Sequence, residues 1–345
     1  MKRRKFIKMT VMGAAGTTLP LRYLDAVDVD SALSQSLAED LEATSGTNSL
    51  IPSSMITPTG EFYVLQIRRP PHIKSAHWRL RVSGLVENEQ IFRYADITQM
   101  PSVTTMRTLK CIGDLIGAEQ MSNAMWTGVP LADVLQKAGV KKGAKVVVFR
   151  CADGYHTAIP LDRALREETL LVYKMNGEAL PQDHGFPVRL LNPGHYGTKN
   201  PKWIVDIMLA EKHEGYWEKR GWDPIARVKL ATLIGTPRDS EKIQGGTVYT
   251  ISGAAFDSGN HDGIKSVEVS RDAGNTWEAA ELWASDSPLA WYLWKYTWHV
   301  PKNSGAIEIY ARAIANDGLI QRESGYDAEP AGAVGYHTVR AEIVE

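Results

Sequence analysis

Two cysteines carry the most distinctive chemistry of this 345-residue chain. Cys111 stands in RTLKCIGDLIGAEQ, after a stretch of alternating apolar residues and before a loop that contains glycine. A thiolate at a strand end can reach a metal or a substrate, and thiolates suit soft metals and metals in high oxidation states. Cys151 lies inside the apolar run VVVFRCADG, which favours a buried structural thiol. Residue types alone leave open a structural role for Cys111 too, or a single disulfide.

Cationic side chains gather beside glycines in PQDHGFPVRLLNPGHYGTKNPKW. Glycines allow close backbone approach to a phosphate, and Lys or Arg neutralises its charge. Neither a GxxxxGK[ST] loop nor a GxGxxG after a strand occurs, so this is not a common nucleotide-binding motif. A solvated, turn-rich loop is the alternative. The polar residues of the cluster are Asp183, His184, Arg189, His195, Lys199 and Lys202.

The elements that must position these groups mix strands and helices without a clean βαβ alternation, which favours an α+β domain. Helical spacing predicts helices over 129–140, which ends at Gly139, and over 161–170. β-Branched and aromatic runs predict strands over 61–67, 78–86, 144–152, 187–193 and 202–210.

The pattern of apolar and polar residues changes after residues 221–227, where we expect a hinge between domains. Four segments alternate apolar and polar residues, and Asp272 to Asn275 can form a hairpin turn. This pattern predicts an antiparallel β-sandwich of immunoglobulin-like type. Its aromatic strand WYLWKYTW could be a dimer surface or simply core packing. The four segments are 245–256, 265–282, 292–300 and 306–316.

The N-terminus reads MKRRKFIKMTVMGAAGTTLPL, in which two arginines precede a short, weakly apolar stretch. It is typical of a twin-arginine export signal, assigned here to residues 1–30, and predicts a periplasmic protein. A basic terminus without a targeting role is the alternative. Residues 31–54 are predicted as a linker with one helical piece, 55–220 as the catalytic domain and 225–345 as the sandwich.

Composition excludes some classes of protein. No apolar run approaches the roughly 20 residues of a membrane-spanning helix. The net charge is −1 although five cationic residues lie within the first eight, so the rest of the chain is mildly acidic. Such a charge balance argues against nucleic-acid binding, which depends on clustered Lys and Arg.

Several segments, in order along residues 55–340, resemble the sulfite oxidase family of molybdopterin-dependent oxidoreductases. Individually each is a weak signal, but together and in order they are specific. The segments are WRLRVSGLV, TLKC, NAMWTGVPLADVL, GYHTAIPL, LPQDHGFPVRLL, PGHYGTKNPKWI, GYWEKRGW and, in the family's dimerisation domain, VEVSRDAGNTW.

The resemblance implies a mixed α/β molybdopterin-binding domain followed by a dimerising sandwich. It implies that Cys111 is the thiolate ligand of molybdenum and that Tyr155 is the active-site tyrosine. His184 and Arg189 match the pair that binds the pterin and its phosphate. Lys199, which stands where many members carry Arg, and Asp153, Asn200 and Lys202 match further cofactor contacts.

Two departures concern the substrate. Leu65-Gln66-Ile67 stands where sulfite oxidases commonly carry Arg-Asn-His, and the loop Asp114 to Gln120 lacks a second arginine and adds two acids. Each lost charge-assisted bond would cost about 1.5–3 kcal/mol. Arg68, Arg69 or Arg107 could compensate, although an ordinary surface role is the simpler reading of each.

The family's chemistry implies oxygen-atom transfer at the molybdenum, either oxidising sulfite or reducing an S-oxide or N-oxide. The sequence has no CxxCH haem motif, so we expect electrons to pass to a separate periplasmic protein such as a c-type cytochrome. The resemblance also implies a homodimer. A cofactor-free binding or assembly module is the alternative from another class, and the retained Cys111, His184 and Arg189 count against it.

Overall fold

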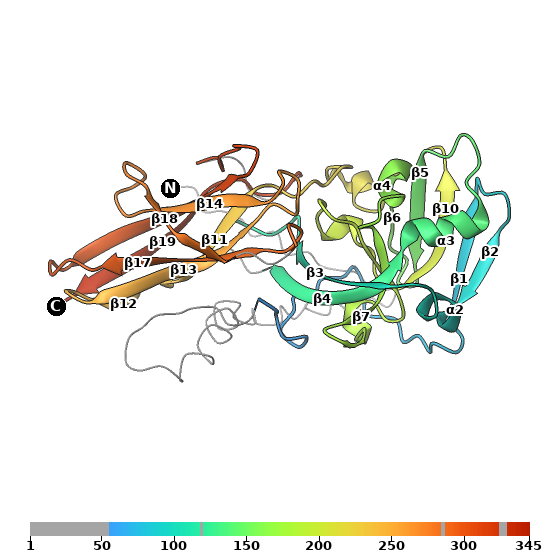
Figure 1. The fold of residues 1–345 in the computed structure, drawn as a ribbon, viewed down its shortest axis with the longest axis horizontal. Coiled ribbons are helices and arrows are strands. Elements are labelled where there is room, and N and C mark those ends of the chain that lie inside the picture. The colour runs from blue at the N-terminus through green and yellow to red at the C-terminus, as the bar shows by residue number, and fades with distance from the viewer. Residues whose placement is uncertain (1–54, 118–119, 284–286, 324–329) are drawn as a thin grey trace, which may run out of the picture.

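The computed structural model describes residues 55–117, 120–283, 287–323 and 330–345. The expected export signal, linker and helical piece before residue 55 lie outside these residues. The described chain forms two halves that lie end to end along the long axis, with the sandwich at one end (Figure 1). Within these residues, no helix is long and apolar enough to cross a membrane.

The first half contains two five-stranded sheets. In the first sheet, β1 and β10 are parallel and the other neighbours are antiparallel. Its order is β2 (Gln90–Arg93), β1 (Arg79–Gly84), β10 (Ile204–Ala210), β5 (Val146–Cys151) and β6 (His156–Pro160). The second sheet is antiparallel, in the order β3 (Val103–Lys110), β4 (Met121–Pro130), β7 (Leu170–Met175) and β8 (Glu178–Ala179), with β9 (Arg189–Leu191) on β7.

Helices are few and short in the described part of this half, which makes it more β-rich than expected. Only α3 (Leu131–Ala138) exceeds two turns, and it ends as predicted at Gly139, whose φ of 69° favours glycine. The other helical segments are α2 (Tyr94–Thr98), α4 (Leu161–Ala164) and the 3₁₀ turns η1 (Gln182–His184), η2 (Gly197–Lys199) and η3 (Glu218–Arg220).

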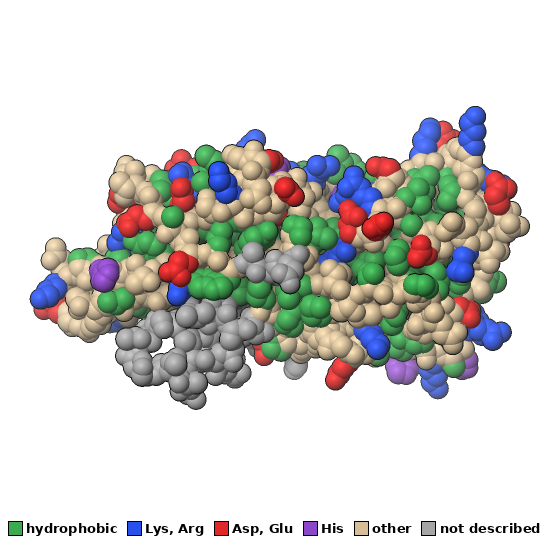
Figure 2. Space-filling model, viewed as in Figure 1, with side chains coloured by type: hydrophobic (Ala, Val, Ile, Leu, Met, Phe, Trp, Pro, Cys, Tyr) green, Lys and Arg blue, Asp and Glu red, His purple; other side chains and the backbone are tan. Residues whose placement is uncertain are grey.

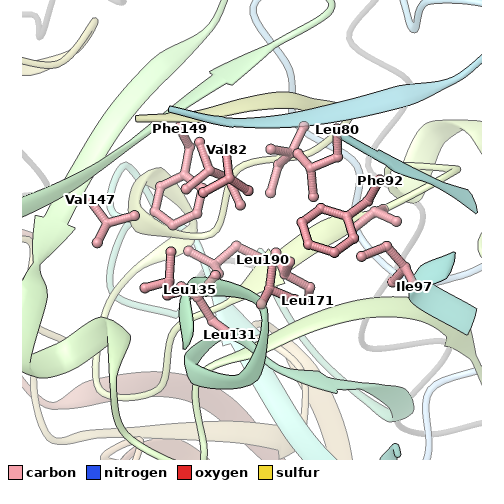
Figure 3. Close-up of a cluster of buried hydrophobic side chains, with 14 of the residues drawn as sticks. Leu80, Val82, Phe92, Ile97, Leu131, Leu135, Val147, Phe149, Leu171 and Leu190 are labelled. Carbon is pink, nitrogen blue, oxygen red and sulfur yellow. The ribbon is translucent and has the colours of Figure 1, made fainter. Parts of the chain in front are cut away.

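A single hydrophobic cluster joins the two sheets through α3. Leu131 and Leu135 of the helix face Val82 and Phe149 of the first sheet, and Leu171 of the second sheet closes the cluster (Figure 3). All five side chains are fully buried. At about 25 cal/mol per Å² of apolar surface, this burial is the main stabilisation of the half that carries the candidate site.

Two predicted elements are wrong in this half. Residues 61–67 form no strand, because the Tyr63 N–H donates to Ser122 Oγ at 3.2 Å rather than to a neighbouring strand. The helix predicted over 161–170 ends after Ala164. There the Thr169 hydroxyl donates to the Arg163 carbonyl at 2.8 Å, taking an acceptor that a continuing helix would need.

The second half consists of two sheets packed face to face, and its described residues contain no helix. One sheet has the order β11 (Ala231–Thr236), β13 (Val248–Phe256), β17 (Tyr292–His299) and β16 (Glu281–Trp283). The other has β12 (Glu241–Gln244), β19 (His337–Val344), β18 (Gly305–Ala315), β14 (Ile264–Ser270) and β15 (Glu278–Ala279). The two-sheet arrangement agrees with the predicted sandwich, but β12 and β19 are parallel rather than antiparallel, and the immunoglobulin-like type stays a prediction.

Two finer expectations for the sandwich are decided by its contacts. The turn at Asp272 to Asn275 joins β14 to β15, which pair in the register Val269 to Glu278. The aromatic strand is core, because Trp294 and Trp298 are 0% and 1% exposed. Lys/Arg and Asp/Glu side chains are interspersed over the face that Figure 2 shows.

The two halves meet in an apolar cluster next to the end of β3. Ile112 and Met121 of the first half pack there with Leu233, Phe256 and Leu293 of the sandwich. The end of β3 and the start of β4 lie on the side of the first half that faces the sandwich (Figure 1). Cys111, directly after β3, therefore lies beside the junction of the two halves.

Candidate functional site

Cys111 is buried at the point where β3 ends and its loop begins. Its side chain is 6% exposed, and burial raises the pKa of the thiol to about 11. The Gly113 N–H donates to the sulfur at 3.3 Å. Cys151 is also buried, within the hydrophobic cluster of the first half, and both thiols are free. This excludes the disulfide between them that the sequence left open.

The loop after Cys111 is held by an ion pair at Asp114 and by a contact with the sandwich. Asp114 is buried, pairs with Lys110 and accepts the Gln120 N–H at 3.0 Å. A Cβ added to Gly117 would lie 2.3 Å from the imidazole of His337, so this loop touches the start of β19. Asp114, one of the acids noted in the sequence, therefore holds the loop rather than adding a free charge.

Two aromatic side chains that the sequence analysis did not single out flank Cys111. A Cβ added to Gly113 would lie 3.4 Å from Trp222 Cη2 and 3.8 Å from Cys111 Sγ. A Cβ added to Gly197 would lie 3.3 Å from Tyr63 Oη and 3.7 Å from the Lys110 carbonyl oxygen. Burial, followed by the charge of Cys111, raises the pKa of Tyr63, so its hydroxyl stays protonated.

Arg189, at the start of β9, is 5% exposed and organises the loop that follows it. Its Nη1 and Nη2 donate to the carbonyls of His184 and Asn200 at 3.1 and 3.2 Å, and its guanidinium lies 5.3 Å from the Trp126 ring. Burial lowers the pKa of Arg189 to about 10. Its Nε is buried without a hydrogen-bond partner.

The Asn200 amide is used to shape the same loop. Its Oδ1 accepts the Asn192 N–H at 2.7 Å, and its Nδ2 donates to the carbonyls of His195 and Tyr196. Both polar atoms of the Asn192 side chain and the hydroxyl of Thr198 are buried without a partner. Unpartnered buried polar atoms are rare in native proteins, and four of the nine in the described residues belong to residues 189–198.

His184 is held neutral. Its Nε2 lies 3.2 Å from the Thr59 carbonyl oxygen, which can only accept, so Nε2 carries the proton and Nδ1 is an acceptor. Burial, followed by the charge of Arg189, lowers the pKa of His184 to about 4. His195, which donates from Nδ1 to the Pro193 carbonyl at 2.9 Å, has its pKa lowered to about 4 by burial.

Lys202 lies in a second polar group, away from the Cys111 loop. Its Nζ donates to Gln66 Oε1 at 3.2 Å and to the Asp183 carbonyl at 2.7 Å. Burial, followed by the charge of Arg189, lowers its pKa to about 7. Asp153 is buried nearby, accepts the Tyr155 N–H at 3.0 Å and has its pKa raised by burial.

Lys199 and Tyr155 are already engaged in this structure. The three donors of Lys199 go to Thr157 Oγ1, the Ala158 carbonyl and the Glu218 carboxylate. The Tyr155 hydroxyl donates to the Thr198 carbonyl at 2.6 Å, and burial raises its pKa. Their predicted contacts to a cofactor and a substrate stay predictions.

Arg107 does not compensate for an arginine missing beside Cys111. Arg107 lies in β3, four residues before Cys111. It is buried, and its guanidinium donates to the Glu168 carbonyl. Arg68 lies near Gly154, with Nη1 3.5 Å from a Cβ added there, on the side of Asp153. Arg69 is exposed.

The site therefore brings most of the predicted residues together and adds some that the sequence analysis missed. Cys111, Arg189, Asn200 and Tyr63 meet around the loop of η2, whereas Lys202, Asp153 and Gln66 form the neighbouring group. Trp222 lay within GYWEKRGW, a segment already noted for the resemblance. Tyr63, Asn192 and Thr198 gave no signal of their own.

Comparison with known proteins identifies both halves. Residues 67–217 match the model of the oxidoreductase molybdopterin binding domain, and residues 223–329 match the Mo-co oxidoreductase dimerisation domain. Over 166 residues, the chain is 35% identical to the uncharacterized oxidoreductase YuiH of Bacillus subtilis, covering 48% of this chain and 82% of that protein.

Longer relatives are more distant. Mitochondrial sulfite oxidase of Rattus norvegicus is 29% identical over 322 residues, which are 80% of this chain but only 59% of that enzyme. Sulfite oxidase of Arabidopsis thaliana is 29% identical over 339 residues, 80% of this chain and 84% of that enzyme. The sulfane dehydrogenase SoxCD of Paracoccus pantotrophus shares the fold, with a TM-score of 0.72 and 24% identity over 86% of this chain and 81% of that one.

Proposed function

Because the chain belongs to the family of molybdopterin-binding oxidoreductases, we propose that it is a molybdenum enzyme of the sulfite oxidase or dehydrogenase type. It transfers an oxygen atom to or from a small substrate and passes electrons to or from a separate protein. The observation that carries the proposal is the buried Cys111 thiol beside unpartnered polar atoms of the Arg189 loop.

The residues fit a molybdenum–pterin cofactor. Among the described residues, no group of three or more His, Cys, Asp and Glu could hold a metal alone. A metal held by one protein thiolate and by the sulfurs of a pterin needs no such group. Arg189 Nε, Thr198 Oγ1 and the Asn192 amide supply buried donors and acceptors for a polar ligand.

In this proposal the protein binds and orients, and the bound cofactor supplies two-electron oxygen-atom transfer. Cys111 ligates the metal. Arg189 and neutral His184, whose Nδ1 is an acceptor, would hold the pterin. Lys202 and Asp153 lie nearby and would contact the polar groups of the pterin. Lys199 would have to exchange its contact with Glu218 to reach a phosphate, whereas Asn200 keeps the loop in shape.

The experiment that tests this function is the metal content of the purified protein, expressed with cofactor synthesis intact. We expect stoichiometric molybdenum and pterin, and oxygen-atom transfer with an artificial electron acceptor or donor. A colourless protein without molybdenum would overturn the proposal and revive a cofactor-free module.

Three accompanying proposals concern the whole protein. The match to the dimerisation domain supports a symmetric homodimer through an immunoglobulin-like sandwich, which sedimentation as a monomer at micromolar concentration would contradict. The twin arginine at Arg3 and Arg4 supports export to the periplasm, where cell fractionation should find the protein. The electron partner is a c-type cytochrome, and its failure to reoxidise or reduce the enzyme would argue against it.

A further inference from the structure

The loop that carries η2 is anchored near its start by side chains of the sandwich. The Gly194 N–H donates to Ser258 Oγ at 2.9 Å, and the Gly194 carbonyl accepts from Asn260 Nδ2 at 2.9 Å. Gly194 belongs to the half that carries the candidate site, whereas Ser258 and Asn260 follow β13 of the sandwich. Both backbone polar groups of one glycine are therefore bound from the other half.

Asn260 also ties this loop to the segment that enters the sandwich. Its Nδ2 donates to the Val228 carbonyl at 3.0 Å, and the Val228 N–H donates to the Gly194 carbonyl at 3.0 Å. Because both partners of Asn260 are carbonyl oxygens, its amide must present the NH₂ group to them. The position therefore uses the donors of a carboxamide, which an apolar side chain lacks.

A side chain would not fit at position 194. Gly194 has a φ of 80°, and a Cβ added there would lie 2.6 Å from Arg163 Nη2 and 2.7 Å from Asn260 Oδ1. Glycine adopts this conformation without strain and lets both side chains approach the backbone. Arg163, in α4, donates to the Pro193 carbonyl. The start of the loop is therefore clamped between α4 and the sandwich.

One buried carboxylate holds the sandwich loop that presents Ser258 and Asn260. Asp257 is fully buried, and its side chain accepts three backbone N–H groups. Hydrogen bonds to a charged acceptor are stronger than those between neutral groups, so the two side chains are presented on a preorganised loop. The three N–H groups are those of Gly259, His261 and Gly263, at 2.9, 2.9 and 3.2 Å.

The anchored stretch leads directly to the proposed cofactor contacts. The carbonyls of His195 and Tyr196, which follow Gly194, accept from Asn200 Nδ2 at 3.1 and 2.9 Å. The Asn200 carbonyl in turn accepts from Arg189 Nη2 at 3.2 Å. A displacement of Gly194 would move the first two carbonyls, and with them Asn200 and the acceptor that orients Arg189.

We infer that Ser258 and Asn260 are positioning residues for the pterin, and that they act through Gly194. The sandwich fixes the start of the loop and so keeps Arg189 and Asn200 in the arrangement that binds the cofactor. A preorganised loop loses less conformational freedom on binding, which favours retention of the ligand. The sandwich thus has a role in cofactor retention beside the proposed pairing of subunits. This inference rests on the proposed function.

The test measures release of pterin from the molybdenum-loaded protein. The protein is incubated below its unfolding transition and passed through gel filtration at intervals, and the bound pterin is measured as its fluorescent oxidation product. Ser258→Ala leaves the buried Gly194 N–H without its acceptor, so release should be about tenfold faster. Asn260→Ala removes two hydrogen bonds at a half-buried position and should speed release about fivefold. If either variant does not fold, the other decides.

Each variant has a matched control within the sandwich. Ser270 is buried, and its Oγ accepts the Gly274 N–H at 2.9 Å in the hairpin of β14 and β15. Asn316 Nδ2 donates to the Asp262 carbonyl at 2.6 Å. Ser270→Ala and Asn316→Ala therefore remove the same kinds of hydrogen bond without touching Gly194, and both should release pterin at the parent rate.

Visible circular dichroism of protein that is still loaded gives a second readout, because it reports the surroundings of the bound cofactor. The spectrum should change in Ser258→Ala and Asn260→Ala and stay as in the parent in both controls. A residue that serves only the stability of the sandwich would not change this spectrum. Urea unfolding of all four variants gives the stability with which the release rates are compared.

The remaining outcomes contradict the inference or the proposed function separately. Release at the parent rate, or an unchanged spectrum, in both Ser258→Ala and Asn260→Ala would overturn the inference and leave the proposed function in place. Controls that release pterin as fast as their matched variants would also overturn it, because release would then follow general stability. Parent protein without molybdenum would remove the proposed function itself.

Discussion

At the scale of single residues, the two cysteines have similar burial and different neighbours. Cys151 packs in the hydrophobic cluster between the sheets, whereas Cys111 lies at a strand end beside Trp222 and the loop of η2. A buried thiol is an inert side chain unless a metal or a nearby charge stabilises the thiolate. The difference in neighbours therefore predicts a difference in function.

We expect Cys111→Ser to abolish turnover while the pterin stays bound, because Arg189 and His184 are unchanged. Cys151→Ser should keep activity, and its stability should fall by about 1–3 kcal/mol because a hydroxyl replaces a buried thiol. Turnover assays, pterin fluorescence after release and thermal melting measure the three quantities. The reverse pattern would show that Cys151 is the ligand.

Residue types reveal only part of such a site. Cys111, His184 and Arg189 could be predicted from the sequence because their chemistry and spacing are unusual. Tyr63 and Trp222 could not, because an aromatic residue is equally expected in any core, and their significance depends on which glycine they face. For Lys199 the residue type gave an expectation that this structure does not show. Its charge predicted a contact with a phosphate, whereas the fold pairs it with Glu218.

At the scale of elements, the loop after β3 is braced by one buried ion pair. The side chains of Lys110 and Asp114 are 11% and 0% exposed. Removing one partner of a buried pair leaves the other charge desolvated, at a cost of about 3–5 kcal/mol. Because Lys110 keeps slight exposure, we expect Asp114→Asn to lose stability at the lower end of this range, and to retain less molybdenum.

The control for this variant is Glu89→Gln, which breaks the Arg81–Glu89 pair on the surface. Its side chains are 54% and 56% exposed, so the change should stay below about 1 kcal/mol. Urea unfolding and metal analysis compare the two variants. Equal losses would mean that the Lys110–Asp114 pair does not brace the loop.

Elements were predictable where the local pattern and the tertiary contacts agree. α3 follows its apolar spacing because both sheets cover that face, and the sandwich strands follow their alternation for the same reason. Residues 61–67 have a strand's composition but no neighbouring strand to pair with. The helix predicted over 161–170 ends early because the Thr169 hydroxyl donates to the Arg163 carbonyl, which a continuing helix would need as an acceptor. Such competition depends on contacts that a local pattern does not contain.

At the scale of the whole molecule, three histidines make folding sensitive to acid. Burial lowers the pKa of His184, His195 and His337 to about 4, from an unfolded value of about 6.5. Between these values the unfolded chain binds protons that the folded chain does not. Stability is therefore complete above about pH 6.5 and falls as the pH drops toward 4, by up to about 4 kcal/mol per pH unit for three such groups.

His337 allows this prediction to be tested without altering the candidate site residues. It lies in the sandwich against the Cys111 loop, and its Nδ1 accepts the Ile234 N–H at 2.8 Å. His337→Gln keeps an acceptor there and removes one titrating group, so the midpoint of urea unfolding should depend less steeply on pH between 6.5 and 4.5. Parallel profiles for the variant and the parent protein would show that His337 does not contribute. A parent profile that is flat in this window would contradict all three assignments, because buried neutral histidines must gain protons when the chain unfolds.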